Sequence, residues 1–117
     1  AALSASSRGK KLMMMTFGSR GDTQPYVALS KHLKESGFEV LVTTNINNVA
    51  FFESFDIPAR GVYPDMEAWL RTNPGIQAAM ESGNVVKFQS AIGNFLLKEC
   101  PKAFPLQWQA AQDFCPD

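Results

Sequence analysis

The fold of this chain is decided by residues 16–26, TFGSRGDTQPY, where an apolar run ends, two glycines bracket a polar loop and a helical pattern begins. Residues 11–17 are short and almost continuously apolar, which is typical of a strand buried on both faces. Pro25 suits a first helical turn, because its φ fits a helix and the N–H that it lacks would be unpaired there. A strand, a glycine loop and a helix are therefore predicted, with backbone N–H groups able to face a ligand's oxygens.

The pattern that follows predicts a parallel sheet. A first helix is expected from about Gln24 to Ser36, with an apolar stripe of Tyr26, Leu29 and Leu33. Residues 38–44 are β-branched and largely apolar and predict a second strand. A connecting helix of this length would place the two strands parallel to each other.

A further helix and strand continue the alternation. The helix is expected from Asn45 to Phe55, because asparagines, which are preferred helix caps, crowd its start. Residues 57–63 predict a short third strand that tolerates Pro58 near its beginning. These elements indicate an α/β protein with half of a doubly wound, Rossmann-like parallel sheet.

From Pro64 onward the alternation stops, and a helical C-terminal part is expected. Asn84 is suited to cap the longest helix. Pro101 is expected to end that helix, since proline has no N–H to donate, and Pro105 to permit a new start. The shorter helices are expected at residues 65–71, 76–82 and 106–112.

Composition excludes several classes of protein. The 117 residues suffice for one domain with a core but not for two ordinary ones. Eleven basic and eleven acidic residues give no net charge, so no overall field attracts nucleic acid. Cys100 and Cys115 have no histidine cluster, which argues against a zinc site or a disulfide framework and favours a reducing compartment, the cytoplasm. No apolar run has the length of a membrane span, although peripheral membrane contact stays open.

The glycine loop fits neither of two nucleotide-binding fingerprints. A P-loop requires Lys followed by Ser or Thr after its last glycine, whereas Gly21 is followed by Asp22. A dinucleotide fingerprint requires a third glycine and an acid at the end of the second strand, which here ends in residues 43–45, TTN. An Arg-Gly-Asp integrin ligand is disfavoured, because this tripeptide opens a helix behind a buried strand. The composition fits a loop that presents one carboxylate and several donors to a sugar substrate.

The loop and its flanks resemble a known family. Residues 18–29, GSRGDTQPYVAL, followed by Leu33 and residues 37–40, closely resemble the opening of the family 28 glycosyltransferases, in particular the sterol 3-β-glucosyltransferases and the antibiotic-aglycone glycosyltransferases. Residues 108–111, WQAA, resemble the sterol branch at the equivalent distance.

The resemblance implies the N-terminal, acceptor-side domain of a two-domain GT-B fold. Residues 11–117 would form this Rossmann-like domain in truncated form, and residues 1–10 a linker or a processed end. The donor-binding C-terminal domain, a partner in cis, would be absent, so that the 117 residues alone are expected to be inactive. The implied reaction is inverting transfer of a hexose from a nucleotide-sugar, expected to be UDP-glucose, to a hydroxyl of a lipid or sterol-like acceptor. No cofactor and no metal are implied.

The same resemblance implies that Asp22 is the base that takes the proton of the acceptor hydroxyl. The residues expected to bind substrate are Gly18, Ser19, Arg20, Gly21 and Thr23. From spacing alone, Asp22 could instead cap the helix, and Arg20 could be a solvated cation rather than a diphosphate ligand.

The apolar residues of the helical part leave two alternatives open, an acceptor pocket or plain core packing. They are Met66, Trp69, Leu70, Met80, Phe88 and Phe95. The alternative to an enzyme is a non-catalytic, Rossmann-like binding module for an apolar ligand or a partner chain.

Overall fold

A three-stranded parallel sheet forms the centre of the computed structural model, which describes residues 9–117. The strands lie in the order β1 (Lys11–Met15), β2 (Glu39–Asn45) and β3 (Ala59–Tyr63). Of the expected linker or processed end, residues 1–8 lie outside the described range.

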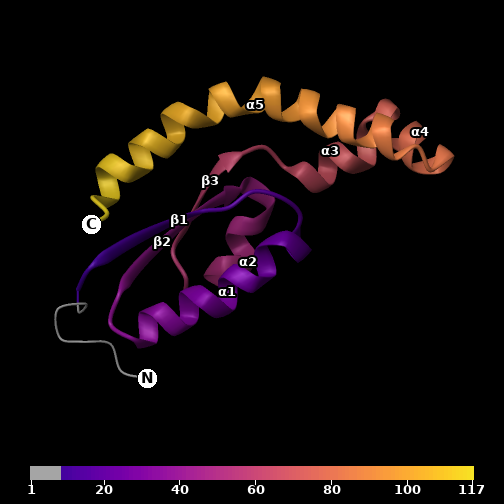
Figure 1. The fold of residues 1–117 in the computed structure, drawn as a ribbon. Helices are drawn as coiled ribbons and strands as arrows, with labels where there is room; N and C mark the ends of the chain where they lie inside the picture. Colours follow the sequence, from indigo (N-terminus) through magenta and orange to yellow (C-terminus); the bar gives the residue numbers. More distant parts are fainter. Residues whose placement is uncertain (1–8) are drawn as a thin grey trace.

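Helices pack on both faces of this sheet and extend beyond its end. They are α1 (Arg20–Glu35), α2 (Val49–Glu53) after a 3₁₀ turn (Ile46–Asn48), α3 (Met66–Thr72), α4 (Pro74–Ser82) and α5 (Val85–Phe114). The helices α1 and α2 lie on one face, and α5 crosses the other (Figure 1). The predicted α/β architecture with a Rossmann-like parallel sheet and a helical C-terminal part is confirmed.

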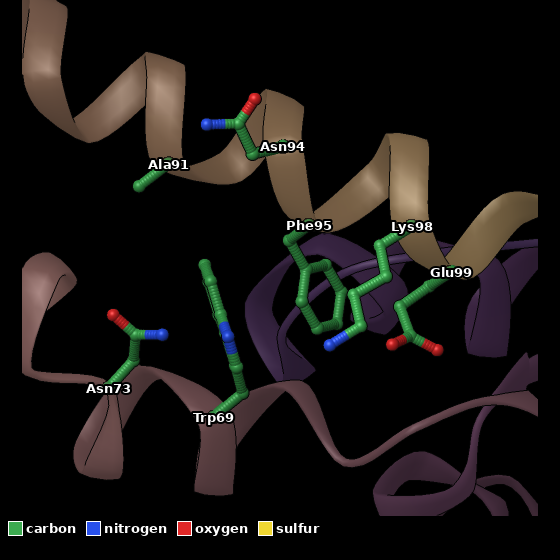
Figure 2. A pocket seen from close by; sticks show the side chains of 7 residues that line it. All are labelled: Trp69, Asn73, Ala91, Asn94, Phe95, Lys98 and Glu99. Atoms are coloured by element: carbon green, nitrogen blue, oxygen red, sulfur yellow. The ribbon is translucent and has the colours of Figure 1, made fainter.

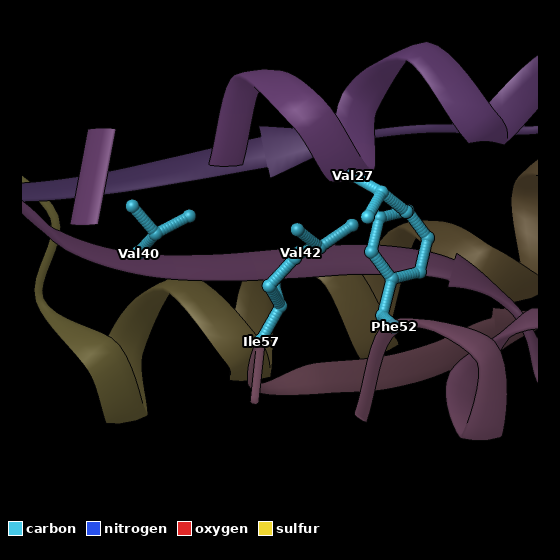
Figure 3. Packing of buried hydrophobic residues seen from close by; sticks show 5 residues of the cluster. All are labelled: Val27, Val40, Val42, Phe52 and Ile57. Carbon is cyan, nitrogen blue, oxygen red and sulfur yellow. The ribbon is translucent and has the colours of Figure 1, made fainter. Parts of the chain in front are cut away.

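The central strand β2 carries the core. Val40 and Val42 of this strand pack with Val27 of α1, Phe52 of α2 and Ile57 (Figure 3). Every residue of β2 after Glu39 is buried, whereas β1 is only half-buried and its last residue is exposed. The expectation of a first strand buried on both faces is therefore wrong, because β1 is an edge strand among the residues that the structure describes.

Helix α1 begins four residues earlier than expected, at Arg20, so that Pro25 lies beyond the first turn. The face toward the sheet is Thr23, Val27 and Ser30, which recur at helical spacing. Two residues of the expected apolar stripe, Tyr26 and Leu29, are exposed. The stripe was misplaced because two of the three residues that face the sheet, Thr23 and Ser30, are polar and give no apolar signal in the sequence.

Helix α5 runs unbroken for 30 residues through both Pro101 and Pro105. Its predicted N-cap is confirmed, because the Asn84 side chain accepts a hydrogen bond from the Lys87 N–H at 3.0 Å. The predicted break at Pro101 is wrong. Each proline removes one backbone hydrogen bond, but packing against the sheet along the helix compensates for the loss, and α5 arches over the sheet (Figure 1). The buried positions of the helix are Phe95, Ala103 and Ala110.

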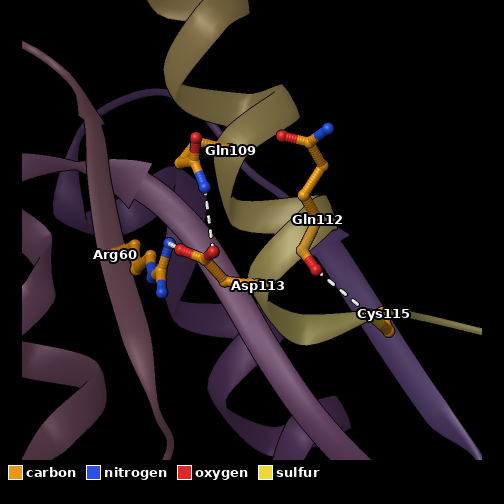
Figure 4. A network of polar contacts seen from close by, with 5 residues as sticks. All are labelled: Arg60, Gln109, Gln112, Asp113 and Cys115. Atoms are coloured by element: carbon orange, nitrogen blue, oxygen red, sulfur yellow. Dashed lines mark hydrogen bonds and ion pairs between the residues drawn. The ribbon is translucent and has the colours of Figure 1, made fainter.

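Polar contacts hold the end of α5 against the sheet. Arg60 of β3 forms an ion pair with Asp113, with 2.8 Å between Nη1 and Oδ2, and Gln109 donates to Asp113 Oδ1 at 2.8 Å (Figure 4). The hydrogen bonds from Arg60 and then Gln109 lower the pKa of Asp113 below its ordinary value. The ionised carboxylate is thus the form that this contact prefers.

The residues after α5 reach the open edge of β1. The Asp117 N–H donates to the Lys11 carbonyl at 2.8 Å, and the Lys11 N–H donates to the Asp117 carboxylate at 2.7 Å. Because the carbonyl of the preceding residue, Lys10, accepts from Glu39 of β2, the backbone groups of Lys11 face away from β2. Asp117 therefore pairs with β1 on the side that β2 leaves open.

Candidate functional site

The polar loops of this protein gather at the carboxyl edge of the sheet. The glycine loop follows β1, Asn45 ends β2, and Pro64 follows β3. Asn45 joins the three, because its side chain accepts from the Gly18 N–H and donates to the Pro64 carbonyl. Ligands of open parallel α/β sheets bind at this edge, so the loops form a candidate site.

Asp22 closes a capping box at the start of α1. Its Oδ2 accepts hydrogen bonds from the N–H of the N-cap residue Ser19 at 2.9 Å and from the Ser19 hydroxyl at 3.0 Å. Among residues 9–117 no group donates a hydrogen bond to Oδ1, and the side chain is exposed. The capping alternative thus accounts for one carboxylate oxygen of Asp22 and leaves the other free to accept a proton.

Gly18 brings the chain against this carboxylate. Its φ of 132° is a conformation that residues with a Cβ rarely adopt, and a Cβ there would lie 2.5 Å from Asp22 Oδ2. The Gly18 N–H donates to Asn45 Oδ1 at 2.9 Å, and the Gly18 carbonyl accepts from Asn48 Nδ2 at 3.0 Å. Both polar groups of this glycine are therefore held by buried side chains.

Asn45 and Asn48 were missed as parts of the site. The sequence suggested that they cap the second helix, but neither makes a side-chain capping hydrogen bond. A usable signal was present: the two asparagines directly follow a strand that was predicted to be parallel to the first. The carboxyl ends of adjacent parallel strands share one edge, where such side chains can reach the glycine loop.

The other residues expected to bind substrate have different surroundings. The Arg20 guanidinium lies over the Phe51 ring, 4.3 Å from its centroid, beside a cleft of about 350 Å³ that Glu67 also lines. Gly21 is exposed in the first turn of α1. Thr23 is fully buried, and its hydroxyl donates to the Arg20 carbonyl at 3.2 Å, so it supports the turn from within.

Aromatic rings lead from the glycine loop toward a second cleft. Phe17, just before the loop, meets Tyr63 edge-on with 4.8 Å between ring centroids and lies 6.3 Å from Phe95. Phe95 in turn lies 4.3 Å from Trp69. The cleft between α3 and α5 has a volume of about 360 Å³, and Trp69 and Phe95 form its apolar wall (Figure 2). Its other lining residues are Asn73, Ala91, Asn94, Lys98 and Glu99.

Only part of the expected apolar set meets in this cleft. Trp69 and Phe95 line it together, whereas Met80 and Phe88 line a separate hollow of about 150 Å³. Met66 is buried in the core.

Residues 9–117 contain neither a metal-binding cluster nor a membrane-spanning helix. No group of three or more His, Cys, Asp or Glu side chains is arranged to bind a metal ion. None of the helices there combines the length and the apolarity that a bilayer crossing requires.

Known proteins resemble this chain over most of its length. The model of the glycosyltransferase family 28 N-terminal domain matches residues 12–105. A sterol 3-beta-glucosyltransferase of Pichia angusta is 29% identical over 106 residues, which are 88% of this chain and 8% of the relative. One of Arabidopsis thaliana is 30% identical over 69 residues, 56% of this chain and 11% of the relative. One of Kluyveromyces lactis is 49% identical over 39 residues, 33% of this chain and 3% of the relative. The chain thus spans a small part of the length of the relatives that it matches.

Proposed function

The chain belongs to the glycosyltransferase family 28 N-terminal domains, and we propose on this premise that it forms the acceptor-side part of an inverting hexosyltransferase. The proposed donor is a nucleotide-sugar, UDP-glucose, and the proposed acceptor is the hydroxyl of a sterol-like or other lipid. A donor-binding domain in the same polypeptide would complete the GT-B enzyme, and residues 1–117 alone would be inactive. The proposed place of action is the cytoplasm, at a membrane that carries the acceptor.

The observation that carries this proposal is the free oxygen of Asp22. While Oδ2 is held by Ser19, Oδ1 of this exposed side chain can accept the proton of an acceptor hydroxyl. The hydroxyl oxygen would form a bond to the anomeric carbon as the bond from that carbon to the diphosphate breaks on the opposite face. The proton passes to Asp22 and the electron pair leaves with the nucleoside diphosphate, so the configuration at the anomeric carbon is inverted.

The loop beside Asp22 offers groups that suit a diphosphate. The start of α1 presents unpaired N–H groups at Arg20 and Gly21, and a guanidinium matches the geometry of phosphate oxygens. The Arg20 side chain is exposed and would leave the Phe51 ring to reach the donor. In this proposal Ser19 and Gly18 shape the turn, and Thr23 supports it from the buried side.

The cleft between α3 and α5 is the proposed acceptor site. Its Trp69 and Phe95 rings can pack on an apolar ring system, and Asn73 and Asn94 can bond a polar end. The neighbouring rings of Trp69, Phe95 and Phe17 connect this cleft with the loop that carries Asp22. The proposed reaction needs no metal and no cofactor, so a chelator should leave its rate unchanged.

The test is Asp22→Asn in the natural full-length protein that contains this chain. An asparagine oxygen can still accept from the Ser19 N–H, so the helix start is kept while the base is lost. We expect kcat to fall by about 10² to 10⁴, the span of a general base, in an assay of labelled hexose transfer to a sterol. Asp65→Asn is the matched control, because Asp65 caps α3 through the Ala68 N–H at 2.9 Å, and it should retain the wild-type rate.

A binding module without catalysis is the second candidate, and the capping box favours it, since capping alone explains why an aspartate stands at position 22. In that case Asp22→Asn would leave ligand binding unchanged, and the wild-type protein would bind an apolar ligand without turning over a nucleotide-sugar. Quenching of Trp69 fluorescence by a sterol, together with no hexose transfer, would favour the module.

A further inference from the structure

We infer that Asn45 and Asn48 are positioning residues, whose two buried amides hold the glycine loop in the shape that presents Asp22 and fix this loop relative to the acceptor cleft. The inference rests on the proposed function, because it assigns these residues to the reaction that Asp22 would assist. Neither residue touches the reacting atoms in this arrangement.

Asn48 holds the carbonyl of Gly18. Its Nδ2 donates to that carbonyl at 3.0 Å and to the Thr44 hydroxyl at 3.4 Å, while its Oδ1 accepts from Asn47 Nδ2 at 3.3 Å. Because Nδ2 has acceptors and Oδ1 has a donor, these hydrogen bonds fix the orientation of the Asn48 amide. With only 1% of its surface exposed, Asn48 has little access to water as an alternative partner.

Asn45 holds the N–H of the same glycine. Its Oδ1 accepts from Gly18 at 2.9 Å, and its Nδ2 donates to the Pro64 carbonyl at 3.0 Å. Pro64 stands two residues before α3, the helix that contributes Trp69 to the cleft. One fully buried amide therefore ties the loop that carries Asp22 to the segment that leads into the acceptor wall.

The two asparagines act on Asp22 through Gly18. At the φ of 132° this glycine leaves no room for a Cβ beside Asp22 Oδ2, and the next residue, Ser19, donates its N–H to that oxygen. A rotation of the Gly18 peptide groups would move the Ser19 N–H and release the carboxylate. Buried amides that lose a partner are costly, so the pair resists such a rotation.

The first experiment measures the loop itself and needs no turnover. We expect Asn45→Ala and Asn48→Ala each to raise amide hydrogen exchange at Gly18 and Ser19 by about fivefold to tenfold, the effect of one lost hydrogen bond. Asn84→Ala is the matched control, because it removes a similar contact to a backbone N–H at the start of α5 and should leave Gly18 and Ser19 unchanged. Unchanged exchange at Gly18 in both loop variants would overturn the inference.

The second experiment asks whether the pair acts through Asp22. In the full-length protein we expect Asn48→Ala to lower kcat by about 10- to 100-fold, the cost of a misplaced catalytic group, with little change in the donor KM. Added to Asp22→Asn, the same substitution should cost less than about threefold more, because the group that it positions is already lost. Fully additive effects would show that Asn48 acts on stability alone and would overturn the positioning role.

The two experiments separate the failure of this inference from that of the proposed function. A wild-type protein without hexose transfer, or an Asp22→Asn variant with full activity, refutes the proposed function and the positioning of a base with it. Hydrogen exchange then still decides whether the asparagines hold the loop. Normal activity in both asparagine variants, with Asp22→Asn inactive, refutes the inference and leaves the proposed function standing.

Discussion

The position of Asp22 would allow one side chain to serve both the fold and the proposed chemistry. One of its oxygens closes the capping box with Ser19, and the other is free among the described residues. A carboxylate anchored through one oxygen loses less freedom when it accepts a proton through the other, because its orientation is already set. The structural and the catalytic interpretations of this residue are therefore compatible.

Gly18 is the residue whose substitution should be most damaging to the loop. A Cβ at this position would lie 2.5 Å from Asp22 Oδ2, in addition to the strain of a φ of 132°. We expect Gly18→Ala to lower the free energy of unfolding by more than about 2 kcal/mol in urea denaturation. Gly83→Ala, with a φ of 67° and no atom near the added Cβ, should cost about 1 kcal/mol. Equal losses in the two variants would contradict the close contact with Asp22.

Individual residues of the loop could be chosen from the sequence, whereas for their partners the sequence indicated only the shared edge of the sheet and not the hydrogen bonds. Gly18, Ser19 and Asp22 stand in a pattern that is specific to a strand–loop–helix unit. Asn45 and Asn48 lie about thirty positions away, and their role depends on the register of β1 against β2. Such long-range pairing is set by the packing of the whole sheet rather than by local propensity.

At the scale of elements, the order of strands and helices was predictable and their limits were less so. Apolar runs separated by amphipathic segments sufficed for the parallel sheet, because each strand and helix buries a recognisable set of side chains. The start of α1 depended on a capping box that overlaps the glycine loop, and the course of α5 through two prolines depended on burial against the sheet. The first limit rests on a local contact between Ser19 and Asp22 that the glycine loop obscures in the sequence, and the second on tertiary packing that overrides a local signal.

Gly93 offers a direct test of how far the sequence of α5 lowers the stability of this helix. It lies inside the helix, and an added Cβ would meet no atom within 4 Å. We expect Gly93→Ala to stabilise the protein by about 1 kcal/mol, because alanine loses less backbone freedom in a helix. The shift appears as a higher midpoint in thermal unfolding followed by circular dichroism. A lower midpoint would reveal a crowded contact at this position.

The contact between α5 and β3 should make stability depend on pH in the acid range. The hydrogen bonds from Arg60 and Gln109 lower the pKa of Asp113, so the contribution is fully present above the ordinary carboxyl pKa and is lost as the pH falls through the lowered value. We expect Asp113→Asn to be slightly less stable than the wild type at pH 7, and the two proteins to converge toward pH 2. Urea unfolding at several pH values measures this. A difference that persists at the lowest pH would contradict the ionic origin.

At the scale of the whole molecule, two surfaces are exposed among the described residues: the outer edge of β1 and an apolar face of α5. Apart from Asp117, no described residue pairs with the outer edge of β1. On the outer side of α5, Leu97, Phe104 and Trp108 share one face at helical spacing and are at least 60% exposed. Exposed strand edges and apolar patches promote association.

We therefore expect the 117-residue chain to self-associate at micromolar concentrations in analytical ultracentrifugation. Phe104→Glu should shift the distribution toward the monomer, since it places a charge in the exposed apolar face. Gln89→Glu adds the same charge to α5 two turns before that face and should change little. A monomer with a sharp, reversible unfolding transition would refute this expectation.

The contact between Lys11 and Asp117 sets an order for the folding of the chain. It joins residues 106 positions apart, whereas β1, α1 and β2 are neighbours in sequence. Closing so long a loop is slow relative to local pairing, so the βαβ units can form first. Helix α5 must then pack on the sheet before the residues after its C-terminus can reach β1. During synthesis the edge of β1 is consequently made about a hundred residues before the segment that covers it.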